Sequence, residues 1–184
     1  MKKLAMFDLD GTLYDTRDVN YYSYKKALEH YGYTLDYQYF VNMCNGRHYK
    51  VFLPEIMEGT EHMEEVHDLK KKYYNEYLGR AKENKHLFHM IQCIKSEYYI
   101  ALVTTASKKN CEEILSYYGR LQDFDLIISQ EDVQNKKPDP EGFLLAMKHF
   151  QILAEESLIF EDSDVGVEAA RKSGASVFVV KGYS

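Results

Sequence analysis

The sequence predicts an α/β protein built on a parallel sheet whose two faces are covered by helices. Short apolar runs alternate with helix-like segments, and the later runs follow one another at ~20–30 residues, as parallel βαβ units require. Short continuous apolar runs are typical of strands buried on both faces, because neither face of the strand meets water. Five runs have this character: Lys3–Leu9, Tyr98–Val103, Asp125–Ser129, Ser157–Phe160 and Ser176–Val180.

The segments after the second run carry signals for the start of a helix. A Ser or Asp side chain can cap the free backbone N–H groups of a first turn, and Pro at the first position has no N–H to satisfy. We expect three helices with such signals: Lys108–Tyr118 after Ser107, a helix that begins at Pro140 after Asp139, and Val165–Ser173 after Asp164.

The first interval between strands is far longer than the others. The first run ends at Leu9 and the second begins only at Tyr98. Helical periodicity recurs in five stretches of this interval: Val19–Tyr31, Leu35–Cys44, Arg47–Met57, Glu61–Leu78 and Leu87–Lys95. We therefore predict a helical cap domain at residues 15–85, inserted after the first strand into a core domain formed by residues 1–14 and 86–184.

Composition excludes several classes of protein. The chain has 184 residues, enough for one domain or one domain with an insertion. No apolar run approaches the ~20 residues that a membrane-spanning helix needs. A net charge of −6 without a basic tract argues against nucleic-acid binding. The three scattered cysteines fit neither a disulfide framework nor a zinc site, so we expect a cytoplasmic protein.

Polar residues follow the predicted strands at their carboxyl ends, the edge at which open parallel sheets bind ligands. They comprise four carboxylates, two hydroxyl groups and one ammonium group: Asp8, Asp10, Thr104, Thr105, Lys137, Glu161 and Asp162. Two carboxylates ~4 Å apart repel by about 4 kcal/mol at an effective dielectric constant of ~20, so the set requires a cation or raised pKa values. Mg²⁺ suits a site with few carboxylates and a phosphate oxygen, and the pattern therefore indicates phosphoryl transfer.

Four motifs in this set resemble those of the haloacid dehalogenase superfamily in its phosphotransferase form. They occur in the family's order, each at the end of a predicted strand: DLDGT at 8–12, ALVTTAS at 101–107, KKPDPEGF at 136–143 and IFEDSDVGVEAARKSGA at 159–175. The place of the insertion is similar to that in the helical-cap (C1) subgroup, which includes β-phosphoglucomutase and phosphoglycolate phosphatase. The resemblance implies a Rossmann-like parallel core flanked by helices, with an α-helical cap after the first strand.

The resemblance also implies a role for each catalytic and phosphate-binding residue. Asp8 is expected to be the nucleophile that forms an aspartyl phosphate. Asp10 is expected to protonate the leaving oxygen and then, as a base, to activate water. Thr104, the Thr105 amide and Lys137 are expected to bind the transferring phosphoryl oxygens.

One metal ion and one small substrate are implied by the same resemblance. Mg²⁺ would be held by Asp8, the Asp10 backbone carbonyl, Asp162 and Glu161. Arg47, in the predicted cap, resembles a position that contacts substrate in related proteins, and its permanent charge suits a phosphate or carboxylate group. The expected partner is a small phosphorylated metabolite, with no nucleic acid and no membrane, and the expected assembly is a monomer or weak homodimer.

A Mg²⁺-dependent phosphatase is the leading prediction, and three other enzymes of the superfamily and a non-catalytic role are alternatives. Phosphosugar mutases of the β-phosphoglucomutase type carry a cap histidine about twelve residues after the nucleophile, where this chain has Asn20. Dehalogenases lack the second carboxylate of the first motif, which is present here as Asp10. Phosphonatases need a cap lysine, and nothing marks Lys25 or Lys26 for that role. A binding or regulatory protein without turnover is disfavoured by the intact acidic and basic positions.

Overall fold

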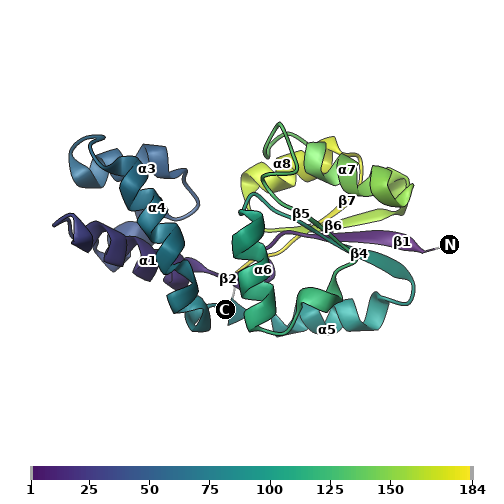
Figure 1. Cartoon of the computed structure of the whole chain (residues 1–184). Coiled ribbons are helices and arrows are strands. Elements are labelled where there is room, and N and C mark those ends of the chain that lie inside the picture. Colours follow the sequence, from purple (N-terminus) through teal and green to yellow (C-terminus); the bar gives the residue numbers. More distant parts are fainter. Residues whose placement is uncertain (1, 183–184) are drawn as a thin grey trace. The chain divides into compact units, whose positions relative to one another are not determined.

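The computed structural model describes residues 2–182 and divides them into two compact units (Figure 1). One unit holds residues 2–15 and 82–182, and the other is Thr16–Ala81. The chain therefore leaves the larger unit soon after its first strand and returns to it before the second strand of the main sheet.

The larger unit is built on a five-stranded parallel sheet with the strand order β5-β4-β1-β6-β7. Strand β1 lies in the centre of the sheet, where its Ala5 pairs with Ile100 of β4 on one side and with Leu158 of β6 on the other. Every predicted apolar run forms one of these strands, so the predicted α/β fold with a Rossmann-like parallel core is confirmed. The strands are β1 (Lys3–Phe7), β4 (Tyr98–Val103), β5 (Leu126–Ile128), β6 (Ser157–Glu161) and β7 (Ser176–Val179).

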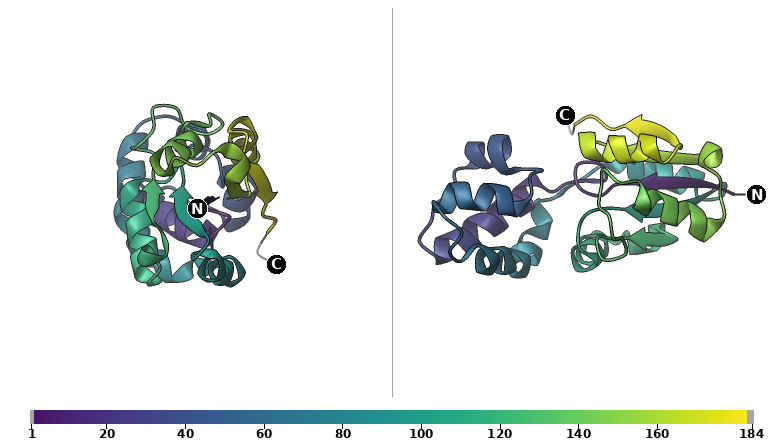
Figure 2. Two further views of the ribbon diagram at one scale, coloured as in Figure 1. Left: turned by 90° about the vertical axis from the view of Figure 1, so that its right-hand side faces the viewer. Right: turned by 90° about the horizontal axis from the view of Figure 1, so that it is seen from above.

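Helices cover both faces of the sheet (Figure 1, Figure 2). One face carries α7 (Glu141–Phe150) and α8 (Asp164–Lys172), and the other carries α5 (Lys85–Ile94) and α6 (Lys108–Tyr117). Two 3₁₀ turns, η3 (Leu121–Asp123) and η4 (Ala154–Glu156), precede β5 and β6. Within residues 2–182 no helix is long and apolar enough to cross a membrane.

Alternate residues of β1 pack on opposite faces of the sheet. Leu4 and Met6 join a buried apolar cluster with Phe143 of α7 and Ala169 of α8. Ala5, between them, is also fully buried, because successive side chains of a strand point to opposite sides and helices cover both. This double coverage explains why the strand is a continuous apolar run in the sequence.

Serine side chains cap the two helices that follow β4 and β6. Ser107 caps α6, as predicted, and its hydroxyl accepts the N–H of Asn110 at 3.3 Å. The cap of α8 is Ser163, whose hydroxyl accepts the N–H of Gly166 at 3.1 Å. The expectation that Asp164 caps this helix is wrong, because Ser163 has the extended backbone of a cap and Asp164 is already helical.

The regular elements of the unit Thr16–Ala81 are all helices, as predicted for this segment. Aromatic residues fill its interior, where Tyr24 packs edge-on against Phe52 with ring centroids 5.1 Å apart. The elements are α1 (Arg17–His30), α2 (Tyr37–Tyr39), the π-helix η1 (Phe40–Cys44), α3 (Tyr49–Met57), α4 (Met63–Tyr73) and the 3₁₀ helix η2 (Tyr74–Arg80).

A two-stranded ribbon in the larger unit holds the exit and return points of the chain together. Its strands are β2 (Tyr14–Asp15) and β3 (Lys82–Glu83), which pair antiparallel. Residue 16 begins the smaller unit directly after β2, and residue 81 ends it directly before β3.

Candidate active site

Asp8, the predicted nucleophile, directly follows β1 at the carboxyl edge of the sheet. Its backbone N–H donates to the Phe160 carbonyl of β6 at 3.0 Å, and the residue is only 5% exposed. The chain then turns at Gly11, which has a φ of +91° and donates its N–H to the Tyr14 carbonyl at 2.7 Å. A Cβ atom at Gly11 would overlap the carboxylate of Asp162. The positive φ and the close approach of Asp162 therefore both require glycine at this position.

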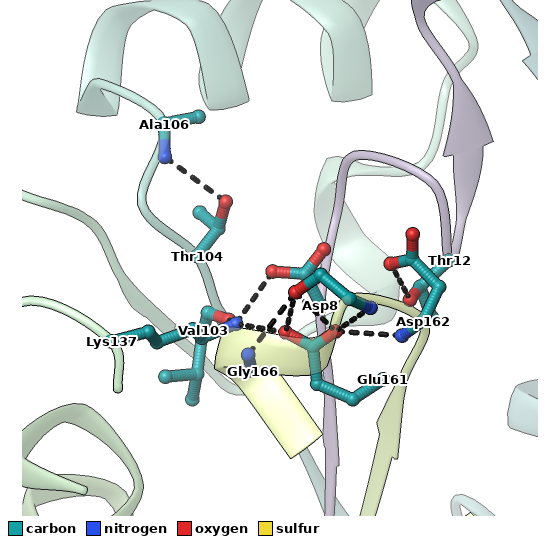
Figure 3. A network of polar contacts seen from close by, with 10 residues as sticks. Asp8, Thr12, Val103, Thr104, Ala106, Lys137, Glu161, Asp162 and Gly166 are labelled. Atoms are coloured by element: carbon teal, nitrogen blue, oxygen red, sulfur yellow. Dashed lines mark hydrogen bonds and ion pairs between the residues drawn. The ribbon is translucent and has the colours of Figure 1, made fainter. Parts of the chain in front are cut away.

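Lys137 reaches Asp8 from the loop between β5 and α7 (Figure 3). Its Nζ donates to Oδ1 of Asp8 at 2.6 Å, to Oε1 of Glu161 at 2.9 Å and to the carbonyl oxygen of Val103 at 3.0 Å. All three donors of the ammonium group are therefore used, and its side chain is 7% exposed. Burial acts to lower the pKa of Lys137, but the negative charges of Asp8 and Glu161 outweigh it and raise that pKa, so the group stays charged.

Glu161 ends β6, and its buried carboxylate lies against the first turn of α8 (Figure 3). Its Oε2 accepts the N–H of Asp162 at 2.6 Å and that of Ser163 at 3.2 Å. A Cβ atom at Gly166 would overlap this carboxylate. The glycine of the EDSDVG sequence therefore leaves the space that Glu161 occupies, and the amino end of the helix stabilises its negative charge.

Negative charge at this edge exceeds what Lys137 balances. Burial raises the pKa of Asp162 to about 6, and the charge of Glu161 adds to the rise. The pKa of Asp8 is also raised well above its usual value, chiefly by burial, with Glu161 and Asp10 adding to the rise and Lys137 opposing it. The carboxylate of Asp162 is oriented by Thr12, whose hydroxyl donates to Oδ1 at 2.9 Å.

Asp8, Glu161 and Asp162 form a cluster that fits a metal ion. One oxygen atom of each lies within 4.8 Å of the others. Lys137 meets two of these three carboxylates with a single positive charge, so negative charge is in excess, and carboxylate oxygens are the ligands that Mg²⁺ prefers. The oxygens of Glu161 already accept hydrogen bonds from Lys137 and Ser163, so contact with an ion would exchange one of these donors.

Thr104 and Thr105 follow β4 at the same edge of the sheet. The Thr104 side chain is buried, and its hydroxyl oxygen accepts the N–H of Ala106 at 3.1 Å, which leaves the hydroxyl hydrogen for another acceptor. Thr104, Thr105 and Lys137 line one pocket. The three residues predicted to bind phosphate are thus brought together.

Asp10 and Arg47 are the remaining predicted site residues. Asp10 is half-buried in the loop after β1, close enough for its charge to raise the pKa of Asp8. Arg47 belongs to the smaller unit, where its guanidinium group pairs with the Glu55 carboxylate at 2.8 and 3.2 Å.

Comparison with known families covers nearly the whole chain. The sequence profile of the haloacid dehalogenase-like hydrolases matches residues 5–180. The chain belongs to this family. The resemblance inferred from the four motifs is therefore confirmed.

Two relatives of this haloacid dehalogenase-like hydrolase are phosphatases. A phosphorylated carbohydrates phosphatase of Thermotoga maritima is 32% identical over 177 residues, which cover 92% of this chain and 81% of the relative. The fructose-1-phosphate phosphatase YqaB of Escherichia coli is 25% identical over 179 residues, which cover 96% and 95%. The predicted enzyme class, a hydrolase of the phosphatase type, is confirmed.

A solved structure shows the same fold in another member of the family. The β-phosphoglucomutase of Clostridium difficile has a TM-score of 0.76 with this hydrolase at 22% identity, and the match covers 100% of this chain and 86% of that one. At this identity the likeness shows the fold alone.

The hydrogen bond between Thr12 and Asp162 helps to shape the site of the hydrolase and could not be predicted from the sequence. Thr12 lies within the DLDGT motif, yet the motif does not indicate that its hydroxyl binds Asp162, 150 residues further along the chain. That contact depends on how β1 and β6 align in the sheet, where Phe7 pairs with Phe160. The one signal in the sequence is that Thr12 is itself a polar residue shortly after the end of a strand, where ligands bind in open parallel sheets.

Proposed function

We propose that this hydrolase is a Mg²⁺-dependent phosphatase that acts on a small phosphorylated metabolite through an aspartyl phosphate. The main support is the contact of Lys137 with both Asp8 and Glu161 beside Asp162. This contact brings a buried carboxylate, a fixed cation and further acidic groups to one edge of the sheet. An aspartate in such surroundings can serve as the nucleophile of phosphoryl transfer.

Asp8 and Asp10 carry the two chemical steps of the proposal. A carboxylate oxygen of Asp8 forms a bond to phosphorus while the bond from phosphorus to the leaving oxygen breaks, and Asp10 gives that oxygen its proton. Asp10 then takes a proton from water, whose oxygen attacks the phosphorus of the aspartyl phosphate. The bond to Asp8 breaks, phosphate leaves, and the Asp8 carboxylate is restored.

Asp8, the Asp10 backbone carbonyl, Asp162 and Glu161 are the groups proposed to hold Mg²⁺. The ion, when bound, supplies positive charge that screens the substrate phosphate from the Asp8 carboxylate. Thr12 keeps Asp162 oriented for this role through its hydrogen bond of 2.9 Å.

The Thr104 hydroxyl, the Thr105 N–H and the Lys137 ammonium are proposed to bind the phosphoryl oxygens. Because all three Lys137 donors are already used, a phosphoryl oxygen would replace one of the present acceptors, while the other two hold the ammonium group in place as negative charge develops on that oxygen. Burial strengthens this effect, because water screens a buried ammonium group less than an exposed one.

A phosphorylated sugar is the proposed substrate class, because the two relatives described above act on phosphorylated carbohydrates and on fructose 1-phosphate.

The unit Thr16–Ala81 is proposed to be a cap that excludes water and sets specificity, with Arg47 as its contact for an anionic group. A monomer or weak homodimer in the cytoplasm completes the proposal. The free thiols of Cys44, Cys93 and Cys111 support a reducing compartment.

A phosphosugar mutase is the second candidate, because a β-phosphoglucomutase shares the fold. The position of the mutase histidine is Asn20, whose Nδ2 donates to the Thr16 carbonyl at 3.2 Å. An asparagine cannot serve as a general acid or base near neutral pH, which favours the phosphatase. Incubation with a sugar 1-phosphate separates the two: a phosphatase releases phosphate, whereas a mutase yields the 6-phosphate.

The proposal is tested by phosphate release from a panel of sugar phosphates in Mg²⁺ and in EDTA. We expect turnover only with the divalent ion, and a loss of about 10³-fold or more in kcat for Asp8→Asn. Asp68→Asn, which changes an exposed carboxylate on α4, is the matched control and should keep full activity. Equal rates in EDTA, or undiminished turnover by Asp8→Asn, would contradict the mechanism. No release from any ester, together with tight binding of another molecule, would favour the non-catalytic alternative.

A further inference from the structure

Asn84 lies where the chain returns to the larger unit, directly after β3. Its Nδ2 donates to the Thr12 carbonyl at 3.1 Å, and its own N–H donates to the Leu13 carbonyl at 2.8 Å. Its Oδ1 accepts the N–H of Leu87 at 3.2 Å and so caps α5. One half-buried residue therefore joins the start of α5 to the loop that follows the proposed nucleophile.

The Thr12 backbone that Asn84 holds carries the hydroxyl that orients Asp162. Thr12 is fully buried, and its Oγ1 lies 2.9 Å from Oδ1 of Asp162. A threonine side chain is restricted at χ1, so the position of its hydroxyl follows the position of its backbone. A shift of the Thr12 carbonyl is thus transmitted to the Asp162 carboxylate.

Hydrogen bonds inside the loop set its shape but do not attach it to α5. The N–H groups of Leu13 and Tyr14 both donate to the Leu9 carbonyl at 3.0 Å. These bonds close the loop on itself, whereas the two bonds from Asn84 connect its carbonyls to a helix packed on the sheet. Asn84 therefore adds a side-chain link at Thr12 to the attachment that the pairing of Tyr14 with Glu83 provides.

We infer that Asn84 is a positioning residue of the proposed metal site, and that it acts by holding Thr12, which in turn orients Asp162. The inference rests on the proposed function, since the orientation of Asp162 matters only where the ion binds. Residues in direct contact with a metal ligand typically change metal affinity by about 10–100-fold when they are lost. Asn84 acts one residue further from the ligand, so its effect should be smaller.

Substitutions can separate the two roles of the Asn84 side chain. Asn84→Asp keeps an acceptor for the cap of α5, because aspartate and asparagine cap helices equally well, but it has no donor for the Thr12 carbonyl. Thr12→Val removes the hydroxyl and keeps the branched shape. Ser157→Ala is the matched control, because it removes a hydrogen bond of 2.9 Å to the Leu153 carbonyl at the opposite end of β6.

Two measurements test the inference: Mg²⁺ affinity by titration calorimetry, and amide hydrogen exchange of the metal-free protein. Asn84→Asp should raise the Kd for Mg²⁺ by about 3- to 10-fold, and Thr12→Val by about 10- to 100-fold. Asn84→Asp should also speed the exchange of the Leu13 and Tyr14 amides in the metal-free protein. Ser157→Ala should change neither quantity.

The double variant shows whether Asn84 acts through Thr12. In the Thr12→Val background, Asn84→Asp should add less than about twofold to the Kd, because the link it disturbs is already absent. Unchanged affinity of the single Asn84→Asp variant, unchanged loop exchange, or a full additive effect in the double variant would overturn the inference. A wild type that binds no Mg²⁺ overturns the inference and the metal site together. A wild type that binds Mg²⁺ but releases no phosphate refutes only the proposed function, and the calorimetry still judges Asn84.

Discussion

Nζ of Lys137 lies 2.6 Å from Oδ1 of Asp8, although 129 residues separate the two in the sequence. The same ammonium group binds Glu161 at 2.9 Å, so one buried cation serves two buried carboxylates. Asp162 has no ion pair within residues 2–182, and its pKa is raised to about 6. Changes to the charges of Lys137 or of these carboxylates should therefore affect both the folding stability of the protein and its proposed activity.

Loss of the buried cation should impair both activity and stability. Lys137→Met leaves Asp8 and Glu161 buried without their partner, which should lower the free energy of unfolding by about 3–5 kcal/mol at pH 8. The loss should be smaller at pH 5, because a carboxylate without its cation takes up a proton more readily. We expect phosphate release to fall by about 10²-fold or more.

Lys136→Met is the control for that variant, because Lys136 is the exposed neighbour. Urea unfolding at the two pH values should give a free energy of unfolding within about 0.5 kcal/mol of the wild type for this control. Similar free energies for Lys137→Met and Lys136→Met at pH 8 would show that the ion pairs at Lys137 contribute nothing to stability.

The metal-free protein should lose stability as the pH rises through 6. The folded-state pKa of Asp162, about 6, exceeds its ordinary value of 3.8, so the folded protein holds this proton more tightly than the unfolded chain. The contribution of Asp162 is therefore fully present below about pH 4 and is lost as the pH rises through the folded-state pKa. Asp162→Asn cannot ionise and, in EDTA, should be more stable than the wild type at pH 7.5 by about 1 kcal/mol, a value reduced by solvent screening of a partly buried group.

Mg²⁺ should reverse this order of stability at pH 7.5. An ion that binds only the folded protein stabilises it by about 2.7 kcal/mol at a concentration 100 times its Kd, and Asp162→Asn should lack most of this gain. Thermal unfolding with Mg²⁺ and with EDTA at pH 4.5 and 7.5 measures both effects. Parallel pH profiles of the wild type and the variant in EDTA would contradict the raised pKa.

A methyl group at Gly166 should destabilise the protein despite the helical location. Gly→Ala in a helix normally stabilises by ~1 kcal/mol. At Gly166 the new Cβ would overlap the Glu161 carboxylate, and overpacking of this kind costs about 1–3 kcal/mol. We expect a net loss of up to about 2 kcal/mol in the free energy of unfolding and weaker binding of Mg²⁺.

Gly59→Ala is the matched control, because a Cβ atom there would meet no atom within 4 Å. Chemical unfolding should place this control within about 0.5 kcal/mol of the wild type. A Gly166→Ala variant as stable as the control would mean that the Glu161 carboxylate can move away without cost.

Removal of one buried hydroxyl should stabilise the protein. The Tyr14 side chain is fully buried, and within the described residues its hydroxyl has no hydrogen-bond partner. A buried polar group without a partner costs about 1–3 kcal/mol, so Tyr14→Phe should raise the free energy of unfolding by about 1 kcal/mol. Tyr21→Phe is the opposite case, because the Tyr21 hydroxyl donates to the Leu35 carbonyl at 3.2 Å, and it should lower stability by about 1 kcal/mol. A lower melting temperature for Tyr14→Phe than for the wild type would contradict this reading.

Periodicity and motif order were enough to predict the sheet and the residues at its edge. The run Tyr98–Val103 is apolar throughout because helices cover both faces of β4, and that burial leaves a direct trace in the sequence. Asp8 and Lys137 could be assigned to one edge because parallel strands all end there. Thr104 could be added for the same reason, since it follows β4.

Contacts between elements were decided only by the folded chain. The hydrogen bond from Thr12 to Asp162 and the one from Asn84 to Thr12 join residues far apart in sequence, and no local pattern pairs them. The choice of Ser163 over Asp164 as a cap depended on one backbone conformation. Sequence periodicity records which side of an element is buried, whereas register and side-chain direction arise from the packing of several elements at once. The amino acids alone thus determined the layers and the chemistry of this protein, and tertiary packing decided which groups hold each reactive side chain in place.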